Sequence, residues 1–177
     1  MKIKNQALKQ SIQDHDLEQE VNKLCEKALN DAKDQLHPLL QSVELERLDQ
    51  RREFTQAFRS ALEQRIARKL ASWQPNVQAV FRFDKARIKS HERWDGSIHL
   101  LVMVSKLSKK VKLLGELLDK SLVDHLGQLG WSRFQKCPSV LEVQQVTPNE
   151  VRRGVSYGAM FYAVYTVPVK VWPEKNS

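Results

Sequence analysis

Five basic side chains alternate along one short segment of the chain, each two positions from the next. They are Lys85, Arg87, Lys89, His91 and Arg93. Side chains two positions apart on a β-strand project from one face, about 6.6 Å from each other. That spacing is close to the spacing of phosphates along a nucleic-acid backbone, and each neutralised phosphate strengthens binding and its salt dependence. The alternation predicts a strand face that binds a polyanion.

A turn signal follows this basic run. Asp95 and Gly96 stand between the run and an apolar stretch over residues 98–104, which is typical of a β-hairpin. A loop of three residues, with Gly96 in a left-handed bulge position, aligns Ala86 and Ile88 with the apolar residues of that stretch. A register shifted by one residue exchanges the two faces. The favoured register adds His99 to the predicted polyanion-binding face, directly opposite His91.

The same face has a simpler interpretation. Charged side chains on an exposed strand keep a sheet soluble and discourage pairing between the edges of two molecules. A metal site is not predicted, because two histidines among several cations fall short of the three or four ligands that zinc takes in proteins. The sequence predicts no metal and no cofactor.

Catalytic groups are equally hard to assign. Cys137 follows a lysine, but no histidine near it in the sequence can act as its base. Asp124 and His125 are adjacent on a predicted helix and point about 100° apart, so they do not form a ready dyad. No catalytic residue is assigned, and the interpretation favours a protein that is not an enzyme.

Charge is divided unevenly along the 177 residues. Of the 29 Lys and Arg and 21 Asp and Glu, residues 1–75 hold 13 and 12, for a net charge of +1. Residues 76–177 hold the remaining 16 and 9, for a net charge of +7. A positive field of this kind attracts polyanions and does not direct folding. The division predicts a helical region over 1–75 and a basic α+β module over 76–177.

The first 75 residues show helical periodicity. Leu17, Val21, Leu24 and Ala28 form one apolar stripe at spacings of four and three residues. A second stripe has Phe54, Phe58, Leu62, Ile66 and Leu70 at every fourth position. This second helix is expected to reach Ser72 and to extend over about 30 residues, or about 45 Å. Its stripe predicts either a helical hairpin with the first helix or a long extension that packs on a partner or a second copy.

From Val77 onward the apolar period changes to two. Two strands, a helix over residues 107–126, a strand over 140–146, a turn near Pro148 and a long strand over 155–167 are expected. The predicted fold is therefore α+β, with the helical hairpin or extension followed by an antiparallel sheet module of order β-β-α-β-β.

The sequence as a whole is most consistent with a non-enzymatic binding or regulatory protein whose basic sheet face contacts an acidic partner, with nucleic acid the leading candidate. The first alternative is a protein–protein adaptor or oligomeric scaffold without a nucleic-acid role. The second is an enzyme with an unrecognised pocket between helix and sheet. Two cysteines far apart in the sequence are typical of a reducing compartment, and we expect a cytoplasmic homo-oligomer or partner-bound protein without a transmembrane segment.

Overall fold

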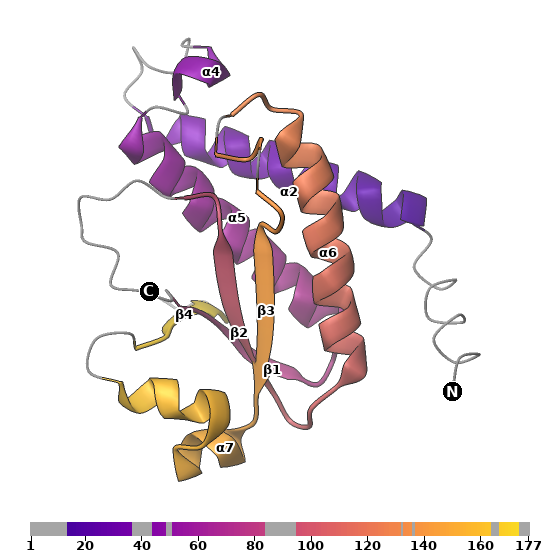
Figure 1. The fold of residues 1–177 in the computed structure, drawn as a ribbon, viewed down its shortest axis with the longest axis vertical. Coiled ribbons are helices and arrows are strands. Elements are labelled where there is room, and N and C mark those ends of the chain that lie inside the picture. Colours follow the sequence, from indigo (N-terminus) through magenta and orange to yellow (C-terminus); the bar gives the residue numbers. More distant parts are fainter. Residues whose placement is uncertain are drawn as a thin grey trace.

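The computed structural model describes residues 14–36, 44–48, 51–83, 95–131, 133–135, 137–163 and 167–173 (Figure 1). In chain order, the described elements are α2 (Asp14–Asp34), α4 (Leu45–Leu48), α5 (Arg52–Trp73), β1 (Val77–Arg82), β2 (Ile98–Val104), α6 (Lys109–Gly127), β3 (Leu141–Val146), α7 (Pro148–Arg153), the 3-10 helix η1 (Ser156–Tyr162) and β4 (Val169–Trp172). The class is α+β, with helices followed by a four-stranded sheet, as the sequence predicts.

The sheet is mixed rather than antiparallel. Its strands lie in the order β3–β2–β1–β4. Strand β1 runs antiparallel to β2 and β4, whereas β2 and β3 are parallel. Helix α6 links β2 to β3, and adjacent parallel strands need a crossover connection of this kind. The prediction of an antiparallel module is therefore wrong for the pair that this helix joins.

The last third of the chain also departs from the predicted β-β-α-β-β arrangement. A helix, α7, replaces the turn expected near Pro148. Thr147 and Glu150 cap it reciprocally: the Thr147 hydroxyl accepts from the Glu150 N–H at 3.2 Å, and the Glu150 carboxylate accepts from the Thr147 N–H at 2.8 Å. The strand expected over 155–167 is instead η1, and the final strand, β4, begins at Val169.

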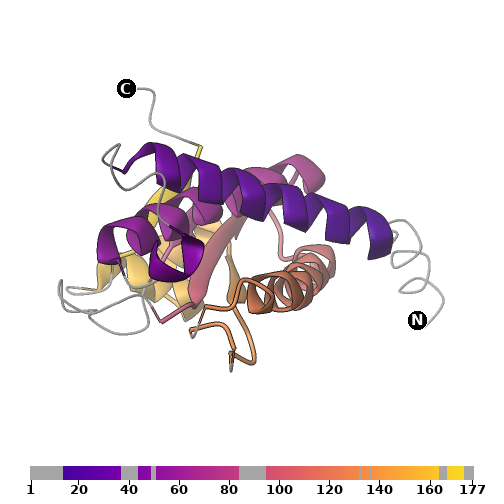
Figure 2. The same cartoon turned by 90° about the horizontal axis from the view of Figure 1, so that it is seen from above.

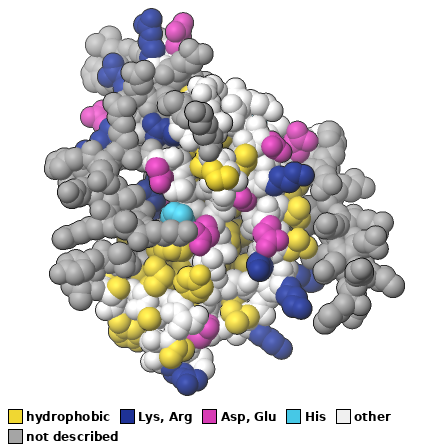
Figure 3. All heavy atoms as spheres, in the orientation of Figure 1, with side chains coloured by type: hydrophobic (Ala, Val, Ile, Leu, Met, Phe, Trp, Pro, Cys, Tyr) yellow, Lys and Arg dark blue, Asp and Glu magenta, His cyan; other side chains and the backbone are white. Residues whose placement is uncertain are grey.

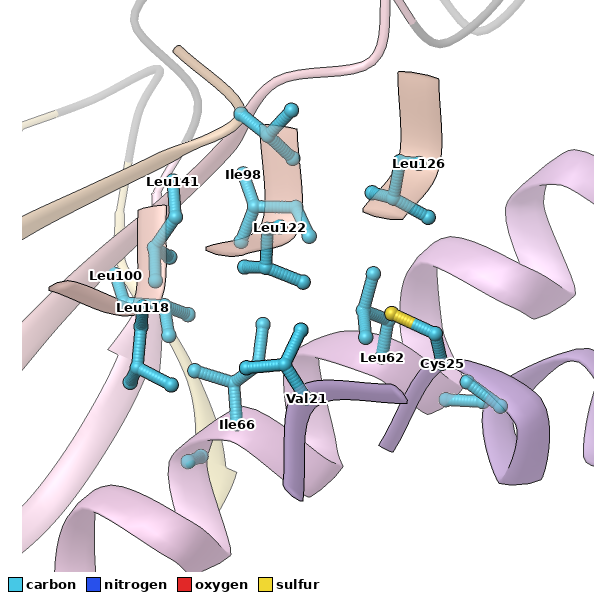
Figure 4. Close-up of a cluster of buried hydrophobic side chains, with 14 of the residues drawn as sticks. Val21, Cys25, Leu62, Ile66, Ile98, Leu100, Leu118, Leu122, Leu126 and Leu141 are labelled. Atoms are coloured by element: carbon cyan, nitrogen blue, oxygen red, sulfur yellow. The ribbon is translucent and has the colours of Figure 1, made fainter. Parts of the chain in front are cut away.

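The core lies between the sheet and its helices. Helices α5 and α6 pack on one face of the sheet, and α2 lies across both of them (Figure 2). Figure 4 shows Val21 and Cys25 of α2, Leu62 of α5, Leu122 of α6 and Ile98 of β2 directed into the same cluster. One core therefore contains residues from both sides of Pro75.

The opposite face of the sheet carries a smaller cluster. Phe83, Leu101 and Val146 are buried there, and Phe161 of η1 packs its ring on Phe81 at 4.9 Å between centroids. Figure 3 views this face: hydrophobic side chains gather toward its centre and lower left, and the described Lys and Arg side chains lie toward its edges. The short α7–η1 unit thus covers part of the sheet face that α5 and α6 leave uncovered.

The long second helix is interrupted. Its predicted span divides into α4 and α5, with Arg51 in an extended conformation just before α5. Helix α2 pairs with α5 inside the chain, and Arg65 of α5 donates to Asp31 of α2 at 2.5 Å. The hairpin alternative accounts for these contacts. Apart from the half-buried Leu24, the apolar stripes of both helices are buried in the core, so self-association through these helices would need another surface.

Candidate functional site

The predicted polyanion-binding residues Lys85, Arg87, Lys89, His91 and Arg93 lie outside the described residues. The described chain reaches the two ends of this segment. At one end, the Phe83 N–H donates to the His99 carbonyl at 3.1 Å, so β1 and β2 remain paired up to that point. At the other end, Asp95 and Ser97 precede β2. The segment therefore joins two adjacent antiparallel strands at one end of the sheet.

The register of β2 differs from the one expected for the hairpin, because Leu100 of β2 pairs with Arg82 of β1. The neighbour of His99 on β1 is Phe83, and its partner on β3 is Glu142. The expected three-residue loop would pair the basic run with β2. Instead, β1 occupies one edge of β2, and its residues Val77, Val80 and Phe81 pair there. Strand β3 occupies the other edge.

The imidazole of His99 is engaged within the sheet. Its Nδ1 lies 3.1 Å from Oε2 of Glu142, and its ring lies 5.5 Å from the ring of Phe83. The other carboxylate oxygen of Glu142 accepts from the Gln144 amide at 2.9 Å. Only 15% of the His99 side chain is exposed. A phosphate arriving at His99 would meet the negative charge of Glu142, so this histidine is a poor contact for a polyanion.

A buried carboxylate lies near this end of the sheet. Glu63 of α5 is fully buried, and the Arg59 guanidinium donates to it at 2.7 Å. Arg82 of β1 approaches its second oxygen at 3.6 Å. A buried charge is tolerated only when it is paired. This triad therefore ties α5 to β1 at the point where the chain leaves the sheet.

Asp95 marks the other end of the segment. Both the backbone N–H and the hydroxyl of Ser97 donate to its Oδ1, at 2.9 and 2.6 Å. Partial burial opposes ionisation, but these hydrogen bonds and the electrostatic attraction of His99 and Arg59 outweigh it and lower the pKa of Asp95. Asp95 is thus a stable anion at the end of the segment, and its hydrogen bonds with Ser97 stabilise the local turn.

A polar groove of about 210 Å³ lies between α2 and α6. Helix α2 contributes Leu17, Glu18 and Asn22 to its lining. Helix α6 contributes Leu117, Lys120, Ser121, Asp124 and His125, and Gln128 lies just after its end. The α6 residues recur at helical spacing, so one polar stripe runs beside the buried apolar stripe of that helix. That spacing is the one signal in the sequence that indicates the α6 side of the groove. Only the packing of α2 on α6 brings Glu18 next to these residues.

Asp124 and His125 therefore both face the groove, although they are neighbours in the sequence. Burial lowers the pKa of His125, and the negative charge of Glu26 on α2 opposes this effect without cancelling it. The imidazole is neutral at neutral pH and offers a nitrogen lone pair.

The two thiols have different surroundings. Cys25 is buried in the core, and burial raises the pKa of its thiol to about 12. Cys137 is half-buried, and its thiol donates to the Ser139 carbonyl at 2.9 Å. Among the described residues, no group of three or more His, Cys, Asp and Glu side chains is arranged to hold a metal ion.

Comparison of the sequence with family models and curated proteins, and of the chain with solved structures, found no significant match. The class that the structure defines is an α+β protein with a four-stranded mixed sheet under three helices. None of the helices in the described ranges combines the length and the apolar character needed to span a bilayer. Functional inference therefore depends on the residues of the chain alone.

Proposed function

We propose that the protein is a non-enzymatic binding protein that contacts a polyanion, with nucleic acid as the partner, through the segment of residues 85–93. The observation that carries the proposal is the alternation of four Lys and Arg side chains and one histidine within nine residues. The contact residues are Lys85, Arg87, Lys89, His91 and Arg93. His99 is left out of the contact, because Glu142 is already its partner.

Acidic residues accompany the basic residues of the segment. With Asp84, Glu92 and Asp95, residues 84–95 hold three acids beside four Lys and Arg. Of the described acids near its ends, Glu63 is paired with Arg59 and Arg82, whereas Asp95 accepts from the neutral Ser97 and keeps its negative charge. The support for the proposal is therefore the alternation of the basic residues and not a surrounding free of acids.

The enzyme alternative has less support from the described residues. The space between α6 and the sheet is filled by apolar side chains, among them Leu100, Leu118 and Leu141 (Figure 4). A protein–protein adaptor remains the competing proposal, and it differs from the first in a measurable way. Binding to a nucleic acid has a steep salt dependence, whereas an exposed charged face that only keeps the protein soluble has no ligand.

The test is a titration of labelled single- and double-stranded oligonucleotides by fluorescence anisotropy, over salt concentrations from about 50 to 200 mM. The variant Arg87→Glu/Lys89→Glu is expected to weaken binding and to reduce the salt slope by roughly 1.4 to 1.8 units, because each of the two lost phosphate contacts contributes about 0.7 to 0.9. Absence of binding by the unmodified protein at the lowest salt would exclude nucleic acid and favour the adaptor.

A matched control separates the segment from the net charge. Lys109 and Lys110 are exposed at the start of α6, and Lys109→Glu/Lys110→Glu makes the same change in charge. Glutamate is favourable in the first turn of a helix, so this variant is expected to fold normally. If both double variants lose affinity equally, the segment is not the contact and only the overall charge matters.

A further inference from the structure

The groove between α2 and α6 is more polar than the packing of two helices requires. Leu17 is buried at its floor, and Leu117 is half-buried beside it. Above them, Asn22, Ser121 and His125 are half-buried, while Glu18 and Asp124 are exposed at the rim. These side chains are still reached by water, and a ligand in the groove would replace that water as their hydrogen-bond partner.

The amides of Asn22 and Gln128 supply both donors and acceptors to the lining, and two of its other side chains carry negative charge. Glu18 and Asp124 are carboxylates, which only accept, and the hydroxyl of Ser121 can also accept. The neutral imidazole of His125 offers one further acceptor nitrogen. Lys120 is the one cation of the lining within the described chain, and it is exposed to water at the rim.

We propose that this groove binds a small organic cation, a primary ammonium compound with a short apolar chain. The ammonium group would donate to Asp124, Ser121 and His125, and the chain would contact Leu17 and Leu117. Glu18 would add a second negative charge on the side of α2. The volume of about 210 Å³ fits a ligand of this size. The site is separate from the segment of residues 85–93, so the two proposals stand or fall independently.

Three probes of similar shape and different charge test the class of ligand: isoamylamine, leucine and isocaproate. The readout is the set of backbone amide NMR signals of the full chain during each titration. Isoamylamine is expected to shift signals of α2 and α6 saturably, with a dissociation constant of about 1 mM or tighter. Leucine is expected to bind more weakly, and isocaproate is not expected to bind.

Two variants test the assigned residues. Asp124→Asn removes the charge at constant shape and is expected to weaken isoamylamine binding about tenfold. Ser121→Val removes the hydroxyl and is expected to weaken it less. Glu116→Gln is the control: this exposed acid lies on the same helix, pairs with Lys112 at 3.9 Å and is not part of the groove lining. It is expected to leave binding unchanged.

Several outcomes would overturn the proposal. Absence of saturable shifts at concentrations far above 1 mM would show that the groove has no such ligand. Binding of isocaproate as tight as that of isoamylamine, or tighter binding of leucine, would exclude the assigned class. An equal loss of affinity in Asp124→Asn and Glu116→Gln would locate the attraction in the net charge of α6 rather than in the groove.

Discussion

The carboxylate of Glu63 accepts from the guanidinium of Arg59 at 2.7 Å, one turn earlier on the same helix, and is itself fully buried. Arg82 approaches it from β1 at 3.6 Å. An ion pair such as that of Arg59 and Glu63 could form on any exposed helix, but here the pair is enclosed between α5 and the sheet. The triad therefore converts a local i, i+4 contact into a link between two layers of the fold.

Replacement of Glu63 by glutamine is expected to destabilise the fold by about 3 kcal/mol, because the two arginines would lose the charge that compensates them in a buried setting. Urea unfolding followed by circular dichroism measures the change. Glu116→Gln, in the exposed pair with Lys112, is expected to change stability by less than about 0.5 kcal/mol. Similar losses in the two variants would show that the buried position of Glu63 has no energetic consequence.

Replacement of Gly158 by alanine is expected to destabilise the packing of η1 on α7. An added Cβ would lie 2.2 Å from the carbonyl oxygen of Glu150, and backbone atoms cannot move aside as a flexible side chain can. The expected loss is about 1–3 kcal/mol, as for other overpacked positions. Near-ultraviolet circular dichroism should change as well, because Phe161 packs on Phe81 through this unit.

Gly127 provides the matched control for that substitution. It ends α6, and a Cβ there would meet no atom within 4 Å. Gly127→Ala is expected to leave stability unchanged or to raise it by up to about 1 kcal/mol, because alanine favours the helix. A stability of Gly158→Ala equal to that of Gly127→Ala would contradict the close approach of η1 to α7.

Each element that was predicted correctly has an apolar pattern that lies entirely within its own residues. Helix α6 follows its stripe of leucines, and β3 follows a short apolar run. The alternating residues Ile98, Leu100, Val102 and Val104 are buried on one face of β2 as expected. In each case the apolar period agrees with the buried face, so the element can be predicted without knowing which other element packs on it.

The features that were not predicted depend on competition between two local sequence signals, or on contacts between segments that lie far apart in the chain. The turn signal of Pro148 competes with the capping pair of Thr147 and Glu150, and the capped helix forms. Tyr157 and Phe161 are four residues apart, a spacing that fits one face of a strand as well as one face of a helical turn. The parallel pairing of β2 with β3, and the groove between α2 and α6, join segments that no local pattern connects.

The two cysteines are expected to react with iodoacetamide at very different rates. Cys25 is buried, and its pKa of about 12 leaves almost no thiolate at neutral pH. Cys137 is half-buried and near the surface. Mass spectrometry of the native protein should therefore find one label, on Cys137, and a second label only in denaturant. The variant Cys137→Ser should acquire none under native conditions, and rapid native labelling of Cys25 would contradict the packing of α2.

The pairing of α2 with α5 is expected to weaken in acid. The hydrogen bond from Lys69 lowers the pKa of Glu20 against the opposing effect of burial, and the charges of Lys69, Lys23 and Lys27 add to the lowering. The folded-state pKa thus lies below the unfolded value of 4.5. The stabilisation is fully present above that value and is lost as the pH falls through the folded-state pKa.

Glu20→Gln should therefore lower stability at neutral pH and flatten the acid limb of the stability profile below about pH 4.5. Urea unfolding at a series of pH values measures both effects. Glu18→Gln is the control, because Glu18 lies on the same helix but its side chain is exposed at the rim of the groove. Its acid limb should match that of the unmodified protein. If Glu20→Gln keeps the full acid limb, the contact between Glu20 and Lys69 does not stabilise the pairing of α2 with α5.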